Sequence, residues 1–503
     1  MSNSRTKNSL LNMAASVGYQ MLNLVLSFVS RTIFLQVLGV GYLGINGLFS
    51  DVLSMLNMAE LGIGTAMTYS MYKPLAENDQ ETLAGLTQFY KKIYRIIAFT
   101  IAAIGVALVP FLPYLINLEQ DIPHVELYYL LFLAGNVASY FVVSKTTVLY
   151  ADQKNHVLIK YSAYWHTAQI ITMLAVLWLT KSYTLYLLTQ VFFVYGQNIH
   201  QSRVADRYYP YLRNKVKLPK EKTRGIFKDV GSAFIYKIAN LLITATDNTL
   251  ISVLVSTEMV GYYSNYSIIV GRLSGIVGTV FSSLIASLGN LIAKEKEERR
   301  YQIFQTMQSV SLILCAFCVT CLLLLEEDFI RIWIGSEYVL SKLALLTIVF
   351  NFYFSMCIRP IATFREAAGL FRKTKYIALW KALLNLILSV LLGMKIGLPG
   401  ILFATSLSAI VTTFWYEPII LYRSYFRIPV RKYYFGLLKG LGITAISVTA
   451  ASISTFWFIP TDWFELVLKG ILVAVPSLAV TLWSYRKEES VKMIISRFPR
   501  IPK

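Results

Sequence analysis

Charged residues are scarce in this 503-residue chain. Only 15% of its residues are Asp, Glu, Lys or Arg, and 56% are hydrophobic, with a mean hydropathy of +0.56. Soluble domains carry about 25% charged residues. A soluble fold of this length does not hide so much apolar surface, so the composition excludes a soluble globular protein. It predicts an all-α polytopic membrane protein, because the apolar runs are long enough to span a bilayer as helices.

Cysteine and histidine are also scarce. The four cysteines give no disulfide framework, and Cys315, Cys318 and Cys321 lie in an apolar run without a nearby histidine, which favours helix packing over a metal site. The four histidines stand alone. The sequence GVGYLG at 39–44 matches GxGxxG, but it follows a membrane helix rather than a strand, and no P-loop or HExxH is present. We therefore expect that the protein is not an enzyme and binds no cofactor or metal. We also expect no cleavable signal peptide, because the first apolar run is too long for one.

The net charge of +20 has two interpretations. In a soluble protein such a surplus indicates nucleic-acid binding. Here most of it lies in short segments between apolar runs, so the positive-inside rule explains it better and no nucleic-acid partner is expected. The basic segments alternate with short acidic or neutral ones, among them residues 117–126, 256–260 and 326–338. This alternation predicts an even number of helices, with both termini in the cytoplasm.

The apolar runs predict about fourteen transmembrane helices. They lie near residues 10–38, 43–72, 93–116, 127–150, 161–180, 184–202, 231–255, 262–293, 303–325, 339–364, 376–394, 400–421, 434–458 and 464–485. The first is longer than the roughly 30 Å core of a bilayer, carries the single charge Arg31 and ends at Gly39-Val40-Gly41. We expect the glycine turn to let two paired helices approach closely at their outer ends.

Parts of the first half return in the second half. The pattern KYxAxW occurs at 160–165 and 375–380, an offset of 215 that Asn136 and Asn351 share. Similar offsets relate Asn23 to Asn240, Thr32 to Thr249 and Gly41 to Gly261. An ordered, slowly drifting offset predicts two pseudo-symmetric six-helix lobes in the same orientation. The predicted organisation is a first lobe (1–212), a basic cytoplasmic linker that is amphipathic in one interpretation (213–230), a second lobe (231–425), and two further helices with a basic tail (426–503).

Ionisable residues inside the predicted helices are the candidates for function. Each costs about 2.5–3.5 kcal/mol at the bilayer centre on insertion scales, so such residues usually face a cavity. The cationic candidates are Arg31, Lys145, Lys237, Arg272 and Arg359. If they line one cavity between the lobes, it suits an anionic headgroup such as a diphosphate, which arginine binds through two parallel hydrogen bonds. The competing interpretation is that those near helix ends, Arg31, Lys145 and Lys237, extend to the interface.

The acidic candidates are Asp51, Glu60 and Asp247. They are expected to take up protons or sodium ions and so to couple transport to an ion gradient or to the membrane potential. The alternatives are structural hydrogen bonding for Asp51 and Glu60 and an ion pair between Asp247 and Arg272. Aromatic residues near the helix ends could stack on sugars, although an interfacial aromatic belt is the more ordinary explanation. They are Tyr150, Tyr161, Trp165, Trp380 and Tyr416.

These features together resemble a known transporter superfamily. The matching pieces are Arg31 with LGVGYLG at 38–44, ELGIG at 60–64, Asp247, and VGYYS at 260–264. With the fourteen-helix layout, the whole chain resembles the polysaccharide transporter branch of the multidrug/oligosaccharidyl-lipid/polysaccharide (MOP) flippase superfamily, the Wzx-type flippases. The resemblance implies a V-shaped pair of bundles that alternate between inward-open and outward-open states, with cavity arginines on helices one and eight, where Arg31 and Arg272 lie.

The resemblance implies a substrate and partners. The substrate is an undecaprenyl-diphosphate-linked oligosaccharide repeat unit, moved from the inner to the outer leaflet for capsule, exopolysaccharide or O-antigen synthesis. The expected partners are membrane lipids, a polysaccharide polymerase and glycosyltransferases. Three alternatives remain: a flippase for a cell-wall lipid precursor or teichoic-type unit, a MATE-like cation-coupled drug antiporter, and a membrane polysaccharide polymerase or glycosyltransferase. The deep basic residues argue against the antiporter, and the short outer segments argue against the enzyme.

Overall fold

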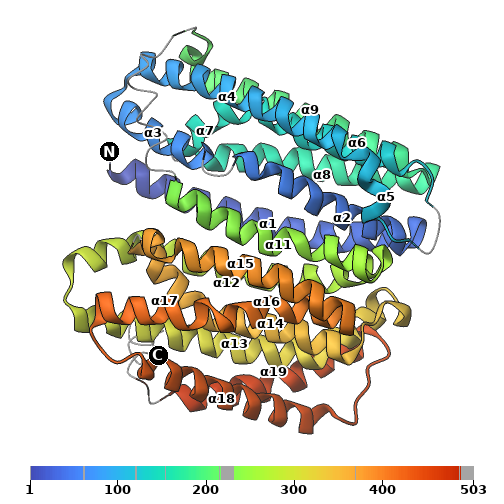
Figure 1. The fold of residues 1–503 in the computed structure, drawn as a ribbon, viewed down its shortest axis with the longest axis vertical. Helices are drawn as coiled ribbons and strands as arrows, with labels where there is room; N and C mark the ends of the chain where they lie inside the picture. Colours follow the sequence, from blue (N-terminus) through green and yellow to red (C-terminus); the bar gives the residue numbers. More distant parts are fainter. Residues whose placement is uncertain are drawn as a thin grey trace, which may run out of the picture. The chain divides into compact units, whose positions relative to one another are not determined.

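The computed structural model describes residues 2–60, 63–118, 122–152, 154–214, 216, 231–368, 370–486 and 488. The described residues form helices joined by short turns, with no β-strand among them (Figure 1). Packing divides the chain into unit 1, Met1–Gly261, and unit 2, Tyr262–Lys503. This division places α11 with the first unit. The lobe boundaries expected from the sequence repeat stay a prediction.

Unit 1 contains the helices from α1 to α11. Their bounds are α1 Ser2–Leu38, α2 Val40–Leu56, η1 Asn57–Glu60, α3 Ile63–Glu77, α4 Gln80–Ala107, η2 Val109–Phe111, α5 Leu112–Leu115, α6 Val125–Tyr140, α7 Val143–Ala151, α8 Asn155–Thr180, α9 Tyr183–Tyr208, η3 Pro210–Arg213 and α11 Gly231–Leu254. Helix α8 packs against α1 and α9, α6 packs against α4 and α9, and α11 packs against α2.

The next helix, α12, begins in unit 1 and continues into unit 2, which holds the helices up to α19. Their bounds are α12 Thr257–Lys294, α13 Glu297–Trp333, η4 Ser336–Tyr338, α14 Lys342–Ala367, α15 Phe371–Ile396, α16 Leu398–Val411, α17 Thr413–Leu421, η5 Tyr422–Phe426, α18 Arg431–Thr455 and α19 Trp463–Tyr485. Helix α13 is central to the packing because it contacts α14, α18 and α19. Helices α18 and α19 also lie side by side (Figure 1).

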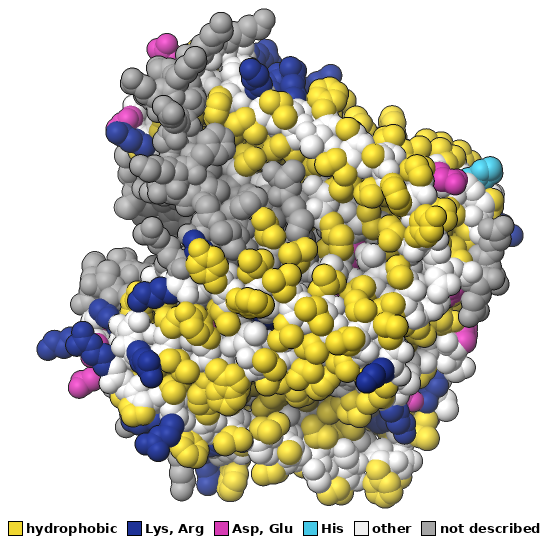
Figure 2. Space-filling view, viewed as in Figure 1, with side chains coloured by type: hydrophobic (Ala, Val, Ile, Leu, Met, Phe, Trp, Pro, Cys, Tyr) yellow, Lys and Arg dark blue, Asp and Glu magenta, His cyan; other side chains and the backbone are white. Residues whose placement is uncertain are grey.

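The helices confirm an all-α, multi-pass membrane protein. Each of the fourteen predicted ranges falls on a helix or on a broken helix. In the described part of the chain, eight helices are long and apolar enough to cross a membrane, and the bent pair α6–α7 makes a ninth. Hydrophobic side chains cover the middle of the face drawn in Figure 2, whereas Lys and Arg side chains gather toward its edges. Such a surface suits a lipid environment.

Two helices of unit 1 are broken, which the sequence did not predict. Helix α2 ends in the single turn η1 before α3 begins, and α6 meets α7 at an angle of 50°. The two breaks lie together, because the Tyr140 hydroxyl donates a hydrogen bond of 2.7 Å to Asn57 Oδ1. Irregular backbone is tolerated at membrane depth only where it is buried in protein or lines a water-filled cavity.

The glycine turn allows a close helix contact in unit 1. Gly39 has a φ of 84°, which favours glycine, and it separates α1 from α2. A Cβ at Gly44 would lie 1.9 Å from the Thr257 carbonyl oxygen, and one at Gly261 would lie 2.5 Å from the Val40 carbonyl oxygen. Only glycine allows α2 and the start of α12 to approach this closely. The prediction of a close approach at the glycine turns is therefore confirmed.

Each unit contains an ion pair with little exposure to solvent, partly buried in unit 1 and buried in unit 2. In unit 1, Lys145 of α7 lies 2.8 Å from Asp206 of α9. In unit 2, the Arg365 guanidinium of α14 pairs with Glu417 of α17, and both side chains are at most 9% exposed. Both pairs join the helices that cover the fourth and sixth predicted ranges of their half, so they occupy matching places in the predicted repeat.

Breaking the unit 2 pair should destabilise the protein. We expect Glu417→Gln to lower the free energy of unfolding by about 3 kcal/mol, because it removes the closer of the two carboxylates beside the buried Arg365 guanidinium and leaves Glu366 at 3.6 Å. Thermal unfolding of the purified protein measures the effect. The control is Glu77→Gln, which removes an exposed partner of Lys73 at 3.9 Å and should leave the unfolding temperature unchanged. Equal unfolding temperatures for the two variants would show that the buried pair contributes nothing.

Candidate functional site

Arg31 lies next to a cluster of aromatic side chains in unit 1. It is partly buried on α1 and is close enough to Tyr186 of α9 to interact electrostatically with it. Around Tyr186 the rings of α1, α2, α6 and α9 pack at centroid distances from 4.7 to 6.0 Å; they belong to Phe34, Tyr42, Tyr128, Tyr183 and Tyr186. The Tyr183 hydroxyl also donates to Asn46 Oδ1 at 3.0 Å. The sequence analysis missed this cluster.

Asp51 and Asp247 come together between α2 and α11. The backbone N–H of Asn248 donates to Asp51 Oδ2 at 3.3 Å. The two carboxyl groups are close enough to interact electrostatically. Among the described residues, the buried atom Asp247 Oδ1 has no hydrogen-bond partner. The structure thus brings two of the three acidic candidates into one site, although they are 196 positions apart in the sequence.

Glu60 occupies the helix breaks of unit 1. Its Oε1 accepts a hydrogen bond of 3.2 Å from the Tyr94 hydroxyl. Tyr140 also lies against it, and the rings of Tyr94 and Tyr140 stack at 6.2 Å. These contacts suit both interpretations of Glu60, a structural hydrogen bond and an ion-coupling group. The choice between them stays a prediction.

The two lysines among the cationic candidates, Lys145 and Lys237, are not seen to line a cavity in the described part of the chain. Lys145 is engaged by Asp206, which Arg213 also approaches at 3.6 Å. The ammonium of Lys145 is therefore held within unit 1, and its predicted role in a substrate cavity stays a prediction. The side chain of Lys237 lies outside the described residues.

Unit 2 brings Arg359 against α12, the helix that carries Arg272. The Arg359 Nη1 atom lies 3.2 Å from the position that a Cβ on Gly278 would take. Arg272 precedes Gly278 by six residues, a rise of about 9 Å along the helix. Arg359 is partly buried, and its Nε has no hydrogen-bond partner within the described ranges. The expected pairing of Asp247 with Arg272 joins residues of different units and stays a prediction.

The turns of unit 1 that the sequence predicts on the outer side are joined by a set of hydrogen bonds. The Thr257 N–H donates to the Asn117 carbonyl at 2.7 Å, and the Asn117 N–H donates to Thr257 Oγ1 at 2.9 Å. Asn117 Nδ2 donates to the Val255 carbonyl at 3.1 Å, and Ser252 Oγ donates to the Leu115 carbonyl at 2.7 Å. We call this set the outer latch. It links the segment after α5 to the turn between α11 and α12.

Unit 1 also contains a cavity of about 340 Å³ between α2, α6 and α9. Its polar lining includes Ser50, Ser54, Asn136 and Gln190. Ser50 precedes Asp51, so the cavity and the acidic site use the same helix. Of the aromatic candidates, Tyr150, Trp380 and Tyr416 are exposed, and Trp165 Nε1 donates to His200 Nδ1 at 2.8 Å. Sugar stacking by these residues stays a prediction.

Comparisons with known proteins identify the fold. The sequence matches no protein family and no curated protein. A structure of the lipid II flippase MurJ in an inward closed conformation is similar at 14% identity and a TM-score of 0.67, covering 95% of this chain and 99% of that one. An inward-facing MATE-family multidrug resistance transporter of the MOP superfamily is similar at 13% identity and a TM-score of 0.62, and the match covers 81% of this chain and 98% of that one. A MOP superfamily transporter from Pyrococcus furiosus is similar at 12% identity and a TM-score of 0.56, and the match covers 82% of this chain and 94% of that one.

The chain is therefore a multi-pass membrane protein with the fold of the MOP superfamily transporters. At these identities the likeness shows the fold alone. The narrower resemblance to the polysaccharide transporter branch stays a prediction.

The outer latch depends on the close approach at Gly44. We expect Gly44→Ala to push α2 away from Thr257 and to loosen the latch, since the new Cβ would overlap the Thr257 carbonyl. The measurement is the rate at which an impermeant thiol reagent labels Ser256→Cys after the four native cysteines are replaced. Labelling should become faster. Gly470→Ala, which has open space around its Cβ, is the control and should change nothing. An unchanged rate in Gly44→Ala would contradict the account of the latch.

Proposed function

We propose that this chain is a flippase that moves an undecaprenyl-diphosphate-linked oligosaccharide from the inner to the outer leaflet of a bacterial plasma membrane. It works by alternating access and supplies repeat units for a capsule, an exopolysaccharide or an O-antigen. The observation that carries the proposal is the contact of Arg359 with α12, the helix that also carries Arg272. Two arginines on neighbouring membrane helices are costly unless they meet an anion or water. The fold, whose solved examples include flippases and drug transporters, supports a transport role.

The diphosphate is the part of the substrate that these arginines would bind. A guanidinium holds a phosphate through two parallel hydrogen bonds, and each contact strengthens where water is sparse. Gly278 supports this role because the absence of a side chain there lets the Arg359 guanidinium approach α12 closely. In unit 1, Arg31 next to the aromatic cluster is the corresponding candidate, with the rings available to stack on sugars.

An ion gradient would drive the cycle through the acidic residues of unit 1. Asp51 and Asp247 repel each other when both are ionised, and a shared proton or sodium ion removes that repulsion. Glu60 with its tyrosines is the second candidate. The membrane potential alone is the remaining source of energy. Opening of the outer latch would accompany the outward-facing state, because the latch closes the outer turns of unit 1.

The proposal includes an orientation and partners. Both termini would be cytoplasmic, as the alternation of basic segments indicates. The glycosyltransferases that complete the lipid-linked unit would act before this protein, and a polysaccharide polymerase would act after it.

A flippase for a cell-wall lipid precursor is the second candidate. The likeness to the lipid II flippase favours it, because that structure covers 95% of this chain. Lipid-linked precursors of both kinds share the diphosphate, so the same arginines would serve. A MATE-like drug antiporter is less favoured, since a cationic drug would be repelled by Arg31, Arg272 and Arg359.

Removal of the unit 2 arginines tests the proposal. Arg272→Ala and Arg359→Ala should each reduce glycan export about 10- to 100-fold, because each loses a charge-assisted contact worth about 1.5–3 kcal/mol. Export is measured as surface polysaccharide per cell, normalised to the amount of protein in the membrane. Lys342→Ala removes an exposed cation from the first turn of α14 and should export normally. Normal export in both arginine variants would remove the case for a diphosphate site.

The acidic pair makes a separate prediction. Asp51→Asn removes one charge of the pair, so export by this variant should no longer respond to collapse of the proton or sodium gradient. The measurement compares export with and without a proton or sodium ionophore. Glu337→Gln, an exposed acid in η4, is the control and should respond as the natural protein does. Export by Asp51→Asn that stays as sensitive as the control would exclude this pair from coupling.

A further inference from the structure

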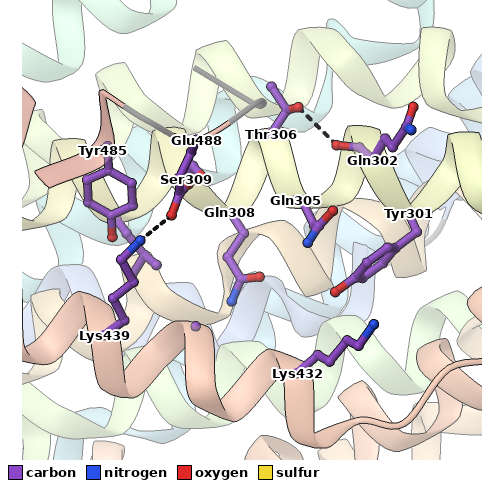
Figure 3. A pocket seen from close by; sticks show the side chains of 12 residues that line it. Tyr301, Gln302, Gln305, Thr306, Gln308, Ser309, Lys432, Lys439, Tyr485 and Glu488 are labelled. Atoms are coloured by element: carbon purple, nitrogen blue, oxygen red, sulfur yellow. Dashed lines mark hydrogen bonds and ion pairs between the residues drawn. The ribbon is translucent and has the colours of Figure 1, made fainter. Parts of the chain in front are cut away.

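A polar cavity of about 370 Å³ opens in unit 2, where α13 and α18 begin and α19 ends (Figure 3). It lies apart from the residues assigned to transport. The side chains of α13 that line it are amides and hydroxyls, among them Gln302, Gln305 and Ser309. From Leu312 onward α13 is largely apolar. The polar stretch from Gln302 to Ser309 rises about 10 Å, comparable with the layer of lipid headgroups.

Two lysines on one face of α18 supply positive charge. Lys432 and Lys439 are seven residues apart, two helical turns, and both line the cavity (Figure 3). Lys439 Nζ lies 2.5 Å from Glu488 Oε1. Lys432 lies over the ring of Tyr301 at 6.0 Å, and no carboxylate in the described part of the chain is within ion-pair distance of it. The cavity therefore has one engaged and one available ammonium.

Glu488 shows how the cavity holds an anion. Its Oε2 accepts a hydrogen bond of 2.7 Å from Ser309 Oγ, while its Oε1 accepts the bond from Lys439. A hydroxyl and an ammonium on adjacent helices thus converge on one carboxylate (Figure 3). The same donors suit the oxygens of a phosphate group. Lys432 and the amide of Gln305 would provide further donors within the same cavity.

The surroundings of the cavity favour a lipid over a soluble anion. Phe435 and Leu438 on α18 are 68% and 63% exposed, so an apolar surface starts beside the lysines. At the end of α19 the guanidinium of Arg486 lies 4.7 Å from the centre of the Trp483 ring, a pair typical of the membrane interface. Below the cavity α13 and α18 pack closely, since a Cβ on Gly440 would lie 2.7 Å from Leu312. A ligand can therefore place its phosphate in the cavity and its acyl chains along the outside.

We propose that this cavity binds the phosphate headgroup of an anionic phospholipid in the leaflet at the basic end of unit 2. Lys432 binds the phosphate first. Lys439 then leaves the Glu488 carboxylate and binds the phosphate instead. Basic pockets between membrane helices on the cytoplasmic side are a recognised setting for anionic headgroups. The site does not depend on the transported substrate, so a binding experiment tests it whether or not the proposed transport is correct.

Native mass spectrometry of the purified full chain measures the lipids it retains. Phosphatidylglycerol, phosphatidylcholine and inorganic phosphate are offered separately, and phosphate is also offered as a competitor of phosphatidylglycerol. We expect phosphatidylglycerol to be retained in preference to phosphatidylcholine, with little effect of phosphate. Lys432→Gln should weaken retention about fivefold, the factor expected for one lysine at an anionic surface. Glu488→Gln should strengthen retention, because it releases Lys439.

Arg431→Gln is the matched control. It removes an equal charge from the neighbouring position, which does not line the cavity, and should retain phosphatidylglycerol as the natural protein does. Equal retention by Lys432→Gln and Arg431→Gln would overturn the site, as would weaker retention by Glu488→Gln. Binding of inorganic phosphate without a preference for phosphatidylglycerol would overturn the assignment to a lipid. All variants change exposed or partly exposed side chains, and unchanged unfolding temperatures verify that they are folded.

Discussion

A charged side chain at membrane depth must find an opposite charge, a hydrogen-bond donor or water, because hydrocarbon offers none of these. The described helices meet this constraint in two ways. Lys145 with Asp206, and Arg365 with Glu417, form ion pairs within one unit and hold helices together. Asp247 and Arg359 keep a buried polar atom without a partner among the described residues. Asp206 and Arg365 also keep one such atom, so the difference is that Asp247 and Arg359 form no ion pair among the described residues. Asp247 and Arg359 are therefore the candidates for binding, since a bound ion or phosphate would supply a partner.

The same constraint applies to the backbone. Helices α2 and α6 of unit 1 break within the predicted membrane-spanning ranges, and the side chains of Glu60, Asn57 and Tyr140 meet at the breaks. At the glycine turn, Gly44 allows helix α2 to approach the Thr257 backbone closely, while Asn117 forms hydrogen bonds with that turn. A bond of this kind can open and close without unfolding a helix. The units thus combine rigid ion pairs with a few polar contacts that a conformational change can exchange.

Much of the fold could be predicted from the sequence, because the apolar runs and the alternating basic segments follow directly from membrane physics. The helix breaks could not, since neither α2 nor α6 carries a proline or a charge run at its break. Residues 326–338 were expected in an outer segment, but α13 continues to Trp333 and buries Glu326 and Asp328. Asp328 pairs there with Lys469 of α19. Periodicity along one helix does not report such a partner on a distant helix.

For the candidate site, the sequence predicted which residues are charged and lie inside helices, but not which of them come together. Asp51 and Asp247 meet, and Arg359 lies against the helix of Arg272. Lys145, in contrast, pairs with Asp206, and no pattern in the sequence indicates that partner. The most direct test of the account is a leaflet assay in wall-stripped cells depleted of this protein. An impermeant glycan-modifying enzyme is added outside, and the lipid-linked oligosaccharide that it reaches is quantified. The account predicts that the intermediate accumulates and stays protected. An intermediate that is still modified from outside would contradict the account, because translocation would then proceed without this chain.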